Sequence, residues 1–325
     1  MDSSTRQGAL EPLIAGSDTT QDLPKTHSGT PPSLRQEAWI KRFFVVCGLF
    51  SLVVMALIML FLFSEGLLLF EDVKPWSFLF GLDWYPTYDP PDFGILALIS
   101  GSVSVTLLSS LMAVPLGVAM ALYLGEVAGN NIREWLKPAV ELLAMLPSVV
   151  LGFVGMVVLA PGLQQLLDIP TGLNVFTASL VLAFMAIPTI TSISEDALRS
   201  VPRDLKEASL ALGATRWETL IRVQVPAALS GIGTAVILGM SRAMGETMVV
   251  LMVAGGAAQI PTSIFDSVRP LPATIAAEMG ETPVGGTHYH ALFAIGIVLF
   301  LMTLGFNILA SYISNRFQQK GQATL

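Results

Sequence analysis

Five windows of this chain, each 22 to 34 residues long, contain no Asp, Glu, Lys or Arg. They cover residues 43–64, 93–125, 142–167, 169–194 and 282–315. A sixth apolar window, residues 223–265, is interrupted only by Arg242 and Glu246. Because a helix needs about 20 residues to cross the hydrocarbon layer of a bilayer, these windows predict an all-α membrane protein with six transmembrane helices.

The composition supports a membrane location. Hydrophobic residues make up 53% of the chain and charged residues 13%, whereas roughly 25% of the residues of an average soluble domain are charged. So few charges cannot cover a water-facing surface, and lipid must therefore form part of the surroundings. The apolar residues occur in long runs, which favours helices over alternating strands. Because the chain has no basic surface suited to nucleic acid, we expect the lipid membrane as a partner and no nucleic acid.

Lys and Arg are distributed unequally between the two sides of the predicted helices. If the N-terminus is cytoplasmic, fourteen of them lie on the cytoplasmic side, and only Lys74 and Arg269 lie outside. Cytoplasmic loops carry the excess of basic residues, so we expect both termini in the cytoplasm. Residues 1–34, rich in Ser, Thr, Pro and Gly, predict a disordered cytoplasmic tail. Residues 35–320 form the predicted transmembrane domain, with its core at about 93–315.

The sequence lacks the short motifs that mark common enzyme sites. A Walker A loop, a His-Glu-x-x-His pair and a Gly-x-Ser-x-Gly elbow are all absent. The single cysteine, Cys47, excludes an intramolecular disulfide and a cysteine metal cluster. His288 and His290 could form a metal pair, but a zinc site needs three or four ligands, so we favour a structural role. We therefore expect no catalytic residue, no cofactor, no metal and no enzymatic activity.

Two segments on the predicted outer side have distinct compositions. Residues 65–92 combine six acidic residues with two Trp and two Tyr, which suits either a solvated loop or a docking surface for an outside partner. Residues 255–286 are rich in Gly, Pro and Thr. This composition favours an irregular hairpin over a seventh span.

A compact helical unit is predicted between the fourth and fifth spans. Pro202 and Gly213 bracket a short helix. One face of it, at helical spacing, consists of Leu205, Ala208, Ser209 and Leu212. Thr215 opens a second helix, with Glu218 placed for a capping box, and Pro226 is predicted to begin the fifth span. The small side chains suit close packing in a protein groove better than insertion into lipid, which favours bulky apolar groups.

The same connection resembles a known motif. Glu207, Ala208 and Ser209, followed by Gly213 and a Val-x-Val-Pro string at 223–226, resemble the EAA loop of ABC-importer membrane subunits. In that family the loop forms a coupling helix, which docks in a cleft of an ATPase subunit. The resemblance implies the type I ABC-importer permease fold. It also implies an ATPase-coupling role, within residues 197–226, for Glu207, Ala208, Ser209 and Gly213.

Two charges lie inside the fifth predicted span. Arg242 and Glu246 are four residues apart and would share one helix face. Intramembrane charges are costly and by default mark a functional path; a buried structural ion pair is the alternative. The guanidinium stays charged when buried and can engage two oxygens of an oxyanion, while Glu246 could hold Arg242 when substrate is absent. We expect both residues in a translocation pathway.

The Arg-Ala-x-Gly-Glu-Thr string at 242–247 resembles the permeases of phosphate importers. Strings within 93–117 and 141–153 resemble the PstC type of that family, and the resemblance covers about residues 40–315. It implies a permease subunit of an ATP-driven phosphate importer in the plasma (inner) membrane of a bacterium. The implied partners are a PstA-like permease subunit, PstB-like ATPase subunits that hydrolyse ATP, and a PstS-like phosphate-binding protein.

Three alternatives stay open at this point. The PstA-type sister subunit shares the Arg-Ala-x-Gly-Glu-Thr string. A permease for another oxyanion, such as sulfate or molybdate, would share the coupling loop. A membrane signalling scaffold for phosphate sensing would use the same spans without transport.

Overall fold

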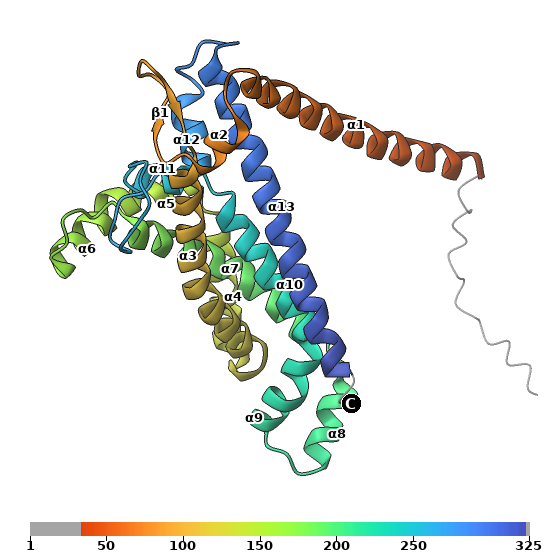
Figure 1. Cartoon of the computed structure of the whole chain (residues 1–325). Coiled ribbons are helices and arrows are strands. Elements are labelled where there is room, and N and C mark those ends of the chain that lie inside the picture. Colours follow the sequence, from red (N-terminus) through yellow and green to blue (C-terminus); the bar gives the residue numbers. More distant parts are fainter. Residues whose placement is uncertain (1–33, 323–325) are drawn as a thin grey trace, which may run out of the picture. The chain divides into compact units, whose positions relative to one another are not determined.

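The structure, a computed structural model, describes residues 34–322 of the chain (Figure 1). Contacts within the chain divide it into two units, residues 1–57 and residues 58–325. The described part of the first unit belongs to helix α1 (Leu34–Asp72), which continues into the second unit. The large apolar side chains of α1 between Trp39 and Leu57 are exposed, as expected for a surface that faces lipid. Residues 1–33 of the predicted tail lie outside the described residues.

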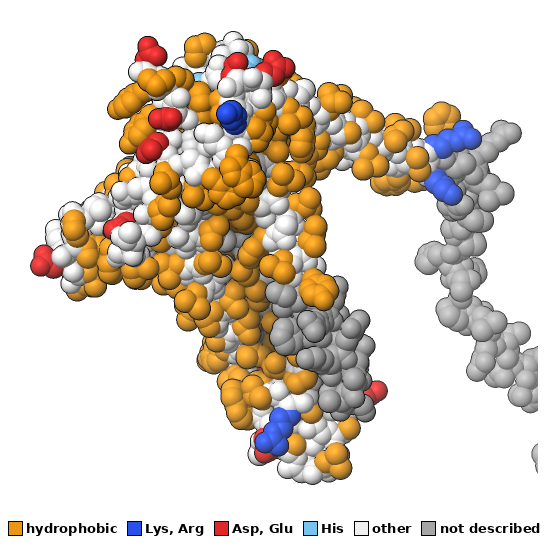
Figure 2. Space-filling view, in the orientation of Figure 1, with side chains coloured by type: hydrophobic (Ala, Val, Ile, Leu, Met, Phe, Trp, Pro, Cys, Tyr) orange, Lys and Arg blue, Asp and Glu red, His pale blue; other side chains and the backbone are white. Residues whose placement is uncertain are grey.

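Six helices in the described part of the chain are long and apolar enough to cross a membrane, which confirms the six predicted spans. Three of them lie within a single helix, and the other three each join several helical elements. The spans are Trp39–Asp72, Leu96–Val127, Ser148–Leu167, Val175–Arg199, Arg216–Met244 and Thr287–Tyr312. In the second unit, hydrophobic side chains cover the middle of the face shown in Figure 2. Charged side chains gather near the end with β1 and near the end with α8 and α9.

Four long helices form the centre of the second unit. They are α3 (Leu96–Leu122), α7 (Val175–Arg199), α10 (Val225–Met244) and α13 (Thr287–Gln322). Helix α7 packs against both α3 and α10, and α10 also packs against α13. The fully buried Ile190 of α7 lies between two glycines: a Cβ on Gly117 of α3 would fall 2.8 Å from it, and one on Gly239 of α10 would fall 2.5 Å from it. Glycine at both positions therefore allows the three backbones to approach closely.

The third span differs from its prediction at one end. The charge-free window begins at residue 142, but helix α4 (Asn130–Met145) ends before Pro147, and the span starts with α5 (Ser148–Val154). Leu146 has an extended backbone with ψ of 131°, the conformation that a following proline favours. A π-helical segment, η2 (Gly155–Leu159), joins α5 to α6 (Ala160–Leu167). The proline thus separates the amphipathic helix α4 from the span.

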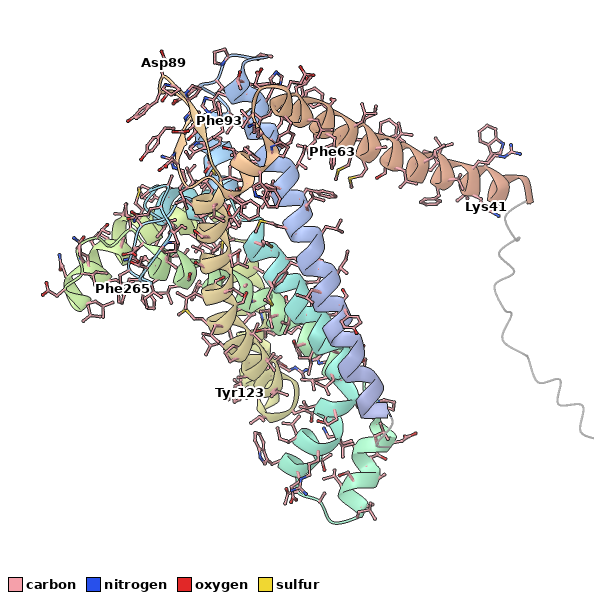
Figure 3. The ribbon with its side chains drawn as sticks, viewed as in Figure 1. Lys41, Phe63, Asp89, Phe93, Tyr123 and Phe265 are labelled. Carbon is pink, nitrogen blue, oxygen red and sulfur yellow. The ribbon has the colours of Figure 1, made fainter. Side chains whose placement is uncertain are left out.

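One end of the second unit carries short elements. Helix α2 (Pro75–Phe80) precedes the antiparallel strands β1 (Trp84–Tyr85) and β2 (Asp92–Phe93), in which Trp84 pairs with Phe93. Figure 3 shows Asp89 and Phe93 at this end and Tyr123 at the far end of α3. Helices α11 (Met248–Val253) and α12 (Leu271–Glu278) also belong here. Residues 255–286 contain no span, as predicted, although α12 was not predicted.

His288 and His290 each contact a carboxylate at this end. Nε2 of His288 lies 2.9 Å from Oε2 of Glu278, whose carboxylate also accepts hydrogen bonds from Trp84 and Arg269. Nδ1 of His290 lies 3.2 Å from Oε2 of Glu65. No group of three or more metal-ligating side chains occurs within the described residues. The contacts agree with a structural role for both histidines.

Candidate functional site

Helix α8 (Arg203–Ala211) forms where the sequence predicts the coupling helix. Asp204 in its first turn complements the positive end of the helix dipole. At the other end, the backbone N–H of Ala214 donates to the carbonyl of Ser209 over 3.2 Å, and that of Gly213 donates to the carbonyl of Leu210 over 3.0 Å. This pair of hydrogen bonds is a Schellman motif, which requires a left-handed residue after the helix. Gly213 supplies it with φ of +87°.

The second helix of this connection, α9 (Arg216–Thr219), begins with the predicted capping box. The backbone N–H of Glu218 donates to Oγ1 of Thr215, and the backbone N–H of Thr215 donates to Oε2 of Glu218 over 2.9 Å. The expectation that Pro226 begins the fifth span is wrong. A π-helical segment, η3 (Leu220–Gln224), joins α9 to α10, so the span runs from Arg216 to Met244. The wider turn before Pro226 accommodates a residue that cannot donate a backbone hydrogen bond.

The predicted coupling residues lie together on α8 and its turn. Helix α8 buries none of its side chains; Glu207 and Ala208 are exposed, and Oγ of Ser209 lies 3.0 Å from Oγ1 of Thr219. A Cβ on Gly213 would meet nothing within 4 Å. These residues therefore present a surface that the described part of the chain leaves uncovered.

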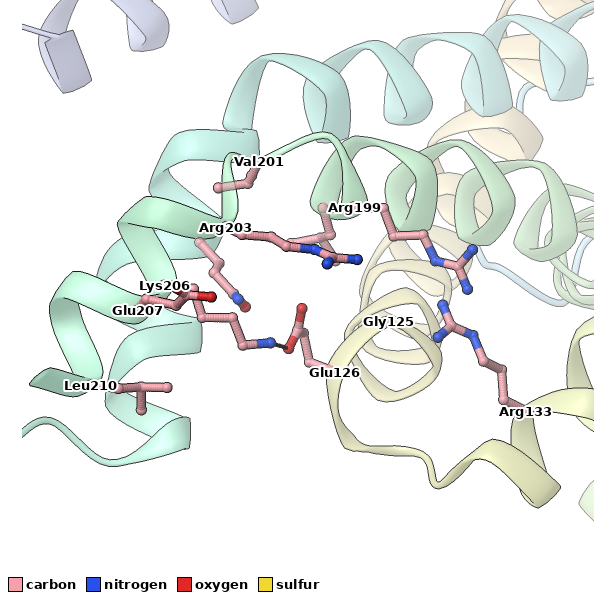
Figure 4. Close-up of a pocket in the computed structure, with 11 residues that line it drawn as sticks. Gly125, Glu126, Arg133, Arg199, Val201, Arg203, Lys206, Glu207 and Leu210 are labelled. Carbon is pink, nitrogen blue, oxygen red and sulfur yellow. Dashed lines mark hydrogen bonds and ion pairs between the residues drawn. The ribbon is translucent and has the colours of Figure 1, made fainter. Parts of the chain in front are cut away.

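A polar cavity of about 670 Å³ separates α8 from the ends of α3, α4 and α7 (Figure 4). Its charged lining residues are Glu126, Arg133, Arg199, Arg203, Lys206 and Glu207. Nζ of Lys206, on α8, forms an ion pair with Oε2 of Glu126. Glu126 belongs to the π-helical segment η1 (Tyr123–Val127), which extends α3. The ion pair therefore connects the predicted coupling helix to the second span.

A buried carboxylate lies next to this cavity, and the sequence reasoning missed it. The side chain of Glu195 on α7 is 1% exposed, and its oxygens lie 2.8 Å from Arg133 Nη2, 2.9 Å from Arg199 Nη2 and 3.1 Å from Lys137 Nζ. Three cations thus compensate one buried anion and fix α4 against α7. The available signal was a carboxylate directly after a charge-free window, with Arg199 four residues later.

Arg242 lies in the last turn of α10, within the fifth span. Its side chain is exposed on this chain, and Nη1 donates to Oγ1 of Thr189 on α7 over 3.3 Å. Next to it, the hydroxyl of Ser241 donates to Asn307 on α13. A lipid-exposed charge at this depth is costly. The guanidinium therefore requires a partner chain, a water-filled path or an anion on its open side.

The expectation that Arg242 and Glu246 share one helix face and form an ion pair is wrong. Helix α10 ends at Met244, and the ion pairs of the described residues do not include these two. Oε1 of Glu246 accepts hydrogen bonds from the backbone N–H groups of Met248, over 3.1 Å, and Val249, over 3.4 Å, at the start of α11. Gly245, a weak helix former, and this competing cap explain why the helix stops.

Comparison with known proteins places these features in a family. The family model described as "Binding-protein-dependent transport system inner membrane component" matches residues 113–319. The probable ABC transporter permease protein YqgH of Bacillus subtilis is 43% identical over 83% of this chain and 88% of its own length. The phosphate transport system permease protein PstC of Mesorhizobium japonicum is 38% identical over 75% of this chain and 80% of its own. PstC of Haemophilus influenzae is 33% identical over 87% and 96%.

Solved structures of ABC transporters share the fold. A chain of a bacterial alginate ABC transporter, in complex with an alginate pentasaccharide-bound periplasmic protein, matches with a TM-score of 0.60 and 18% identity. The match covers 86% of this chain and 96% of that one. A chain of the MetNI methionine ABC transporter in an inward-facing conformation matches with a TM-score of 0.52 and 20% identity, over 69% of this chain and 94% of that one. These likenesses confirm the predicted permease fold.

Proposed function

Because the chain belongs to the family of binding-protein-dependent transport system inner-membrane components, we propose that it is the PstC-type permease subunit of an ATP-driven phosphate importer. The names of the relatives at 33% and 38% identity support phosphate as the substrate and PstC as the subunit type. One structural observation carries the proposal: the Arg242 guanidinium lies exposed in a membrane span, and its hydrogen-bond partner among the described residues is one neutral hydroxyl. An oxyanion is the ligand that this group suits.

Arg242 is the proposed anion-binding residue of the translocation pathway. Its planar fork can donate two parallel hydrogen bonds to a phosphate oxygen pair. Glu246 contributes to the same pathway by shaping it, because its carboxylate caps α11 directly after the helix break at Gly245. A carboxylate held by backbone N–H groups has part of its charge compensated, which limits its repulsion of an arriving anion.

The chain itself hydrolyses no ATP in this proposal. The sequence carries no nucleotide motif, and energy comes from two PstB-like ATPase subunits. Glu207, Ala208, Ser209 and Gly213 form the docking surface for one of them, since α8 is solvent-exposed and ends in a rigid glycine turn. A PstA-like subunit completes the pathway and covers the open side of Arg242. A PstS-like protein delivers the anion; the solved alginate transporter is likewise in complex with a periplasmic protein.

The proposed orientation places the end with α8 and α9 in the cytoplasm, together with both termini. The excess of Lys and Arg in the connections at that end supports it. The end with β1, β2 and α12 then faces outward, where the binding protein docks.

Uptake by the reconstituted complex tests the proposal. This chain, the PstA-like subunit and the PstB-like ATPase subunits are incorporated into vesicles that contain ATP. Uptake of labelled phosphate, sulfate and molybdate is measured with the binding protein outside. Phosphate uptake that requires ATP and the binding protein is the expected result. Uptake of sulfate or molybdate instead would identify a permease for another oxyanion. Phosphate binding without uptake of any of the three would favour a signalling scaffold. A complex that forms only when this chain replaces the PstA-like subunit would identify the sister subunit.

A further inference from the structure

Helix α8 has few side-chain connections to the rest of the chain. It buries no residue, and its polar side-chain contacts to other described elements are two. One joins Ser209 to Thr219 on α9, directly after the Gly213 turn. The other is the ion pair between Lys206 and Glu126 (Figure 4). Of these two contacts, the ion pair is the one that reaches a part of the chain remote in sequence.

Glu126 lies in a segment that is continuous with the second span, so a force on its side chain acts on that span. Segment η1, which carries Glu126, is continuous with α3. The side chain of Lys206 on α8 is 39% exposed and that of Glu126 is 19% exposed, so the carboxylate is the more shielded partner. Further along α3, the carbonyl of Gly117 accepts a hydrogen bond from Oγ1 of Thr191 on α7 over 3.1 Å. Thr191 is two residues from Thr189, the partner of Arg242.

We propose that Lys206 and Glu126 are positioning residues that transmit movement of the coupling helix α8 to α3. This inference rests on the proposed function, because it assumes that an ATPase moves α8. Helix α8 packs against η3 and α9, which follow it closely in the sequence, and the ion pair is its polar contact to a segment remote in the sequence. Movement of α8 can therefore reach α3 directly through that ion pair. When α8 is displaced, the ion pair pulls on η1, and the packing of α3 against α7 carries the shift toward Thr189 and Arg242.

Reversing the charge of each residue, and then exchanging the two charges, tests whether the ion pair between Lys206 and Glu126 transmits movement. The variants are Lys206→Glu, Glu126→Lys, the double swap, and Glu134→Lys as a control. Glu134 is an exposed carboxylate of α4 at the same end of the unit, and no ion pair of the described residues includes it. Each variant is purified in the full complex with its ATPase and binding-protein partners.

Two readouts are measured on each complex. The first is backbone amide hydrogen exchange of residues 123–127, with and without a non-hydrolysable ATP analogue. The second is the ratio of ATPase rates with and without loaded binding protein. We expect the nucleotide to change exchange at 123–127 in the wild type and the control. Each single reversal should lose that change and lower the ATPase ratio about fivefold, the lower end of typical coupling between sites. The double swap should restore both.

Several results would overturn the proposal. Wild-type behaviour of the single reversals would show that the pair transmits nothing, and a double swap that fails to restore would show that the residues act separately. Loss of the ATPase subunit from the single reversals would place Lys206 in the docking surface instead. The exchange readout needs no phosphate. If phosphate-loaded binding protein fails to stimulate the wild-type ATPase, the proposal of phosphate as the substrate is contradicted. Hydrogen exchange at 123–127 still tests whether the ion pair transmits movement.

Discussion

Arg242 on α10 and Thr189 on α7 are joined by a hydrogen bond of 3.3 Å between Nη1 and Oγ1. A hydroxyl offers no negative charge, and no ion pair of the described residues includes Arg242. A guanidinium in a membrane span without a counter-charge raises the free energy of the empty site. An anion that engages Arg242 removes part of that cost. Under the proposed function, this cost favours the binding of an oxyanion at Arg242.

Arg242→Gln is expected to reduce phosphate uptake by about 10- to 100-fold, the range for losing hydrogen bonds to a charged group. Arg242→Lys should recover little, because an ammonium keeps the charge but loses the planar two-pronged geometry. The measurement is uptake into vesicles, normalised to the amount of assembled complex. Thr189→Val is a matched control for the hydrogen bond alone, and it should retain most of the uptake.

Glu246→Gln should preserve assembly, because the amide oxygen can still accept from the backbone of Met248 and Val249. Since Arg242 and Glu246 form no ion pair, the double change Arg242→Gln with Glu246→Gln should transport no better than Arg242→Gln alone. Near-normal uptake by the double variant would contradict the anion-binding role and leave both residues as packing elements.

Gly213→Trp and Glu207→Lys should uncouple ATP hydrolysis from the binding protein while the chain stays in the membrane. Both positions are exposed, so the described part of the chain has room for the new side chains, and a partner groove would reject them. Trp at Gly213 also strains the left-handed backbone of the turn. Substrate-stimulated ATPase activity of the complex is the measurement. Gly213→Asn is the control, because Asn tolerates the left-handed backbone at φ of +87°. Full stimulation in both test variants would remove the coupling assignment of α8.

Glu195→Ala should lower the free energy of unfolding by about 2 kcal/mol, less than for a fully buried pair because the partner cations are partly exposed. The change removes the carboxylate that compensates the positive charges of Arg133, Lys137 and Arg199. Lys137→Met should cost less, since two cations would still compensate the carboxylate. Denaturation of the chain in detergent, followed by helical circular dichroism, measures both. A smaller loss for Glu195→Ala than for Lys137→Met would show that the carboxylate is not the centre of the cluster.

Local signals in the sequence predicted the spans and the position of helix α8 well. A charge-free segment long enough to cross the bilayer is stable in lipid as a helix, because a helix satisfies its backbone hydrogen bonds internally. Thr215, Glu218 and Gly213 act within a single turn of chain, so the cap and the Schellman turn could be read without knowing the tertiary structure.

The features that the sequence did not predict depend on competition between local structures or on partners that are distant in the sequence. Gly245 ends α10 because Glu246 caps the next helix, and helical spacing alone cannot weigh that cap against helix continuation. The three cations around Glu195 come from α4 and α7, and no sequence period brings those helices together. The pairing of Lys206 with Glu126 likewise joins residues 80 positions apart.

Acid should loosen the loop that holds the start of α7. The carboxylate of Asp266 accepts hydrogen bonds from the backbone N–H groups of Thr262 and Ser263, both over 2.8 Å, and from the Thr262 hydroxyl over 2.9 Å. These bonds favour the charged form and hold the pKa of Asp266 below its ordinary value, the Ser263 backbone contributing most. The backbone carbonyl of Asp266 in turn accepts from the N–H of Val175 over 3.0 Å.

Because the folded pKa of Asp266 lies below the unfolded one, its stabilising effect is fully present above the unfolded value of about 4. The effect is lost as the pH falls through the folded value. We therefore expect hydrogen-exchange protection of the Thr262 and Ser263 amides, corrected for the intrinsic pH dependence of exchange, to stay constant from pH 7 to pH 5. Protection should fall only below about pH 4. Asp266→Ala should show low protection at every pH, and an unchanged profile in that variant would mean that the carboxylate does not hold the loop.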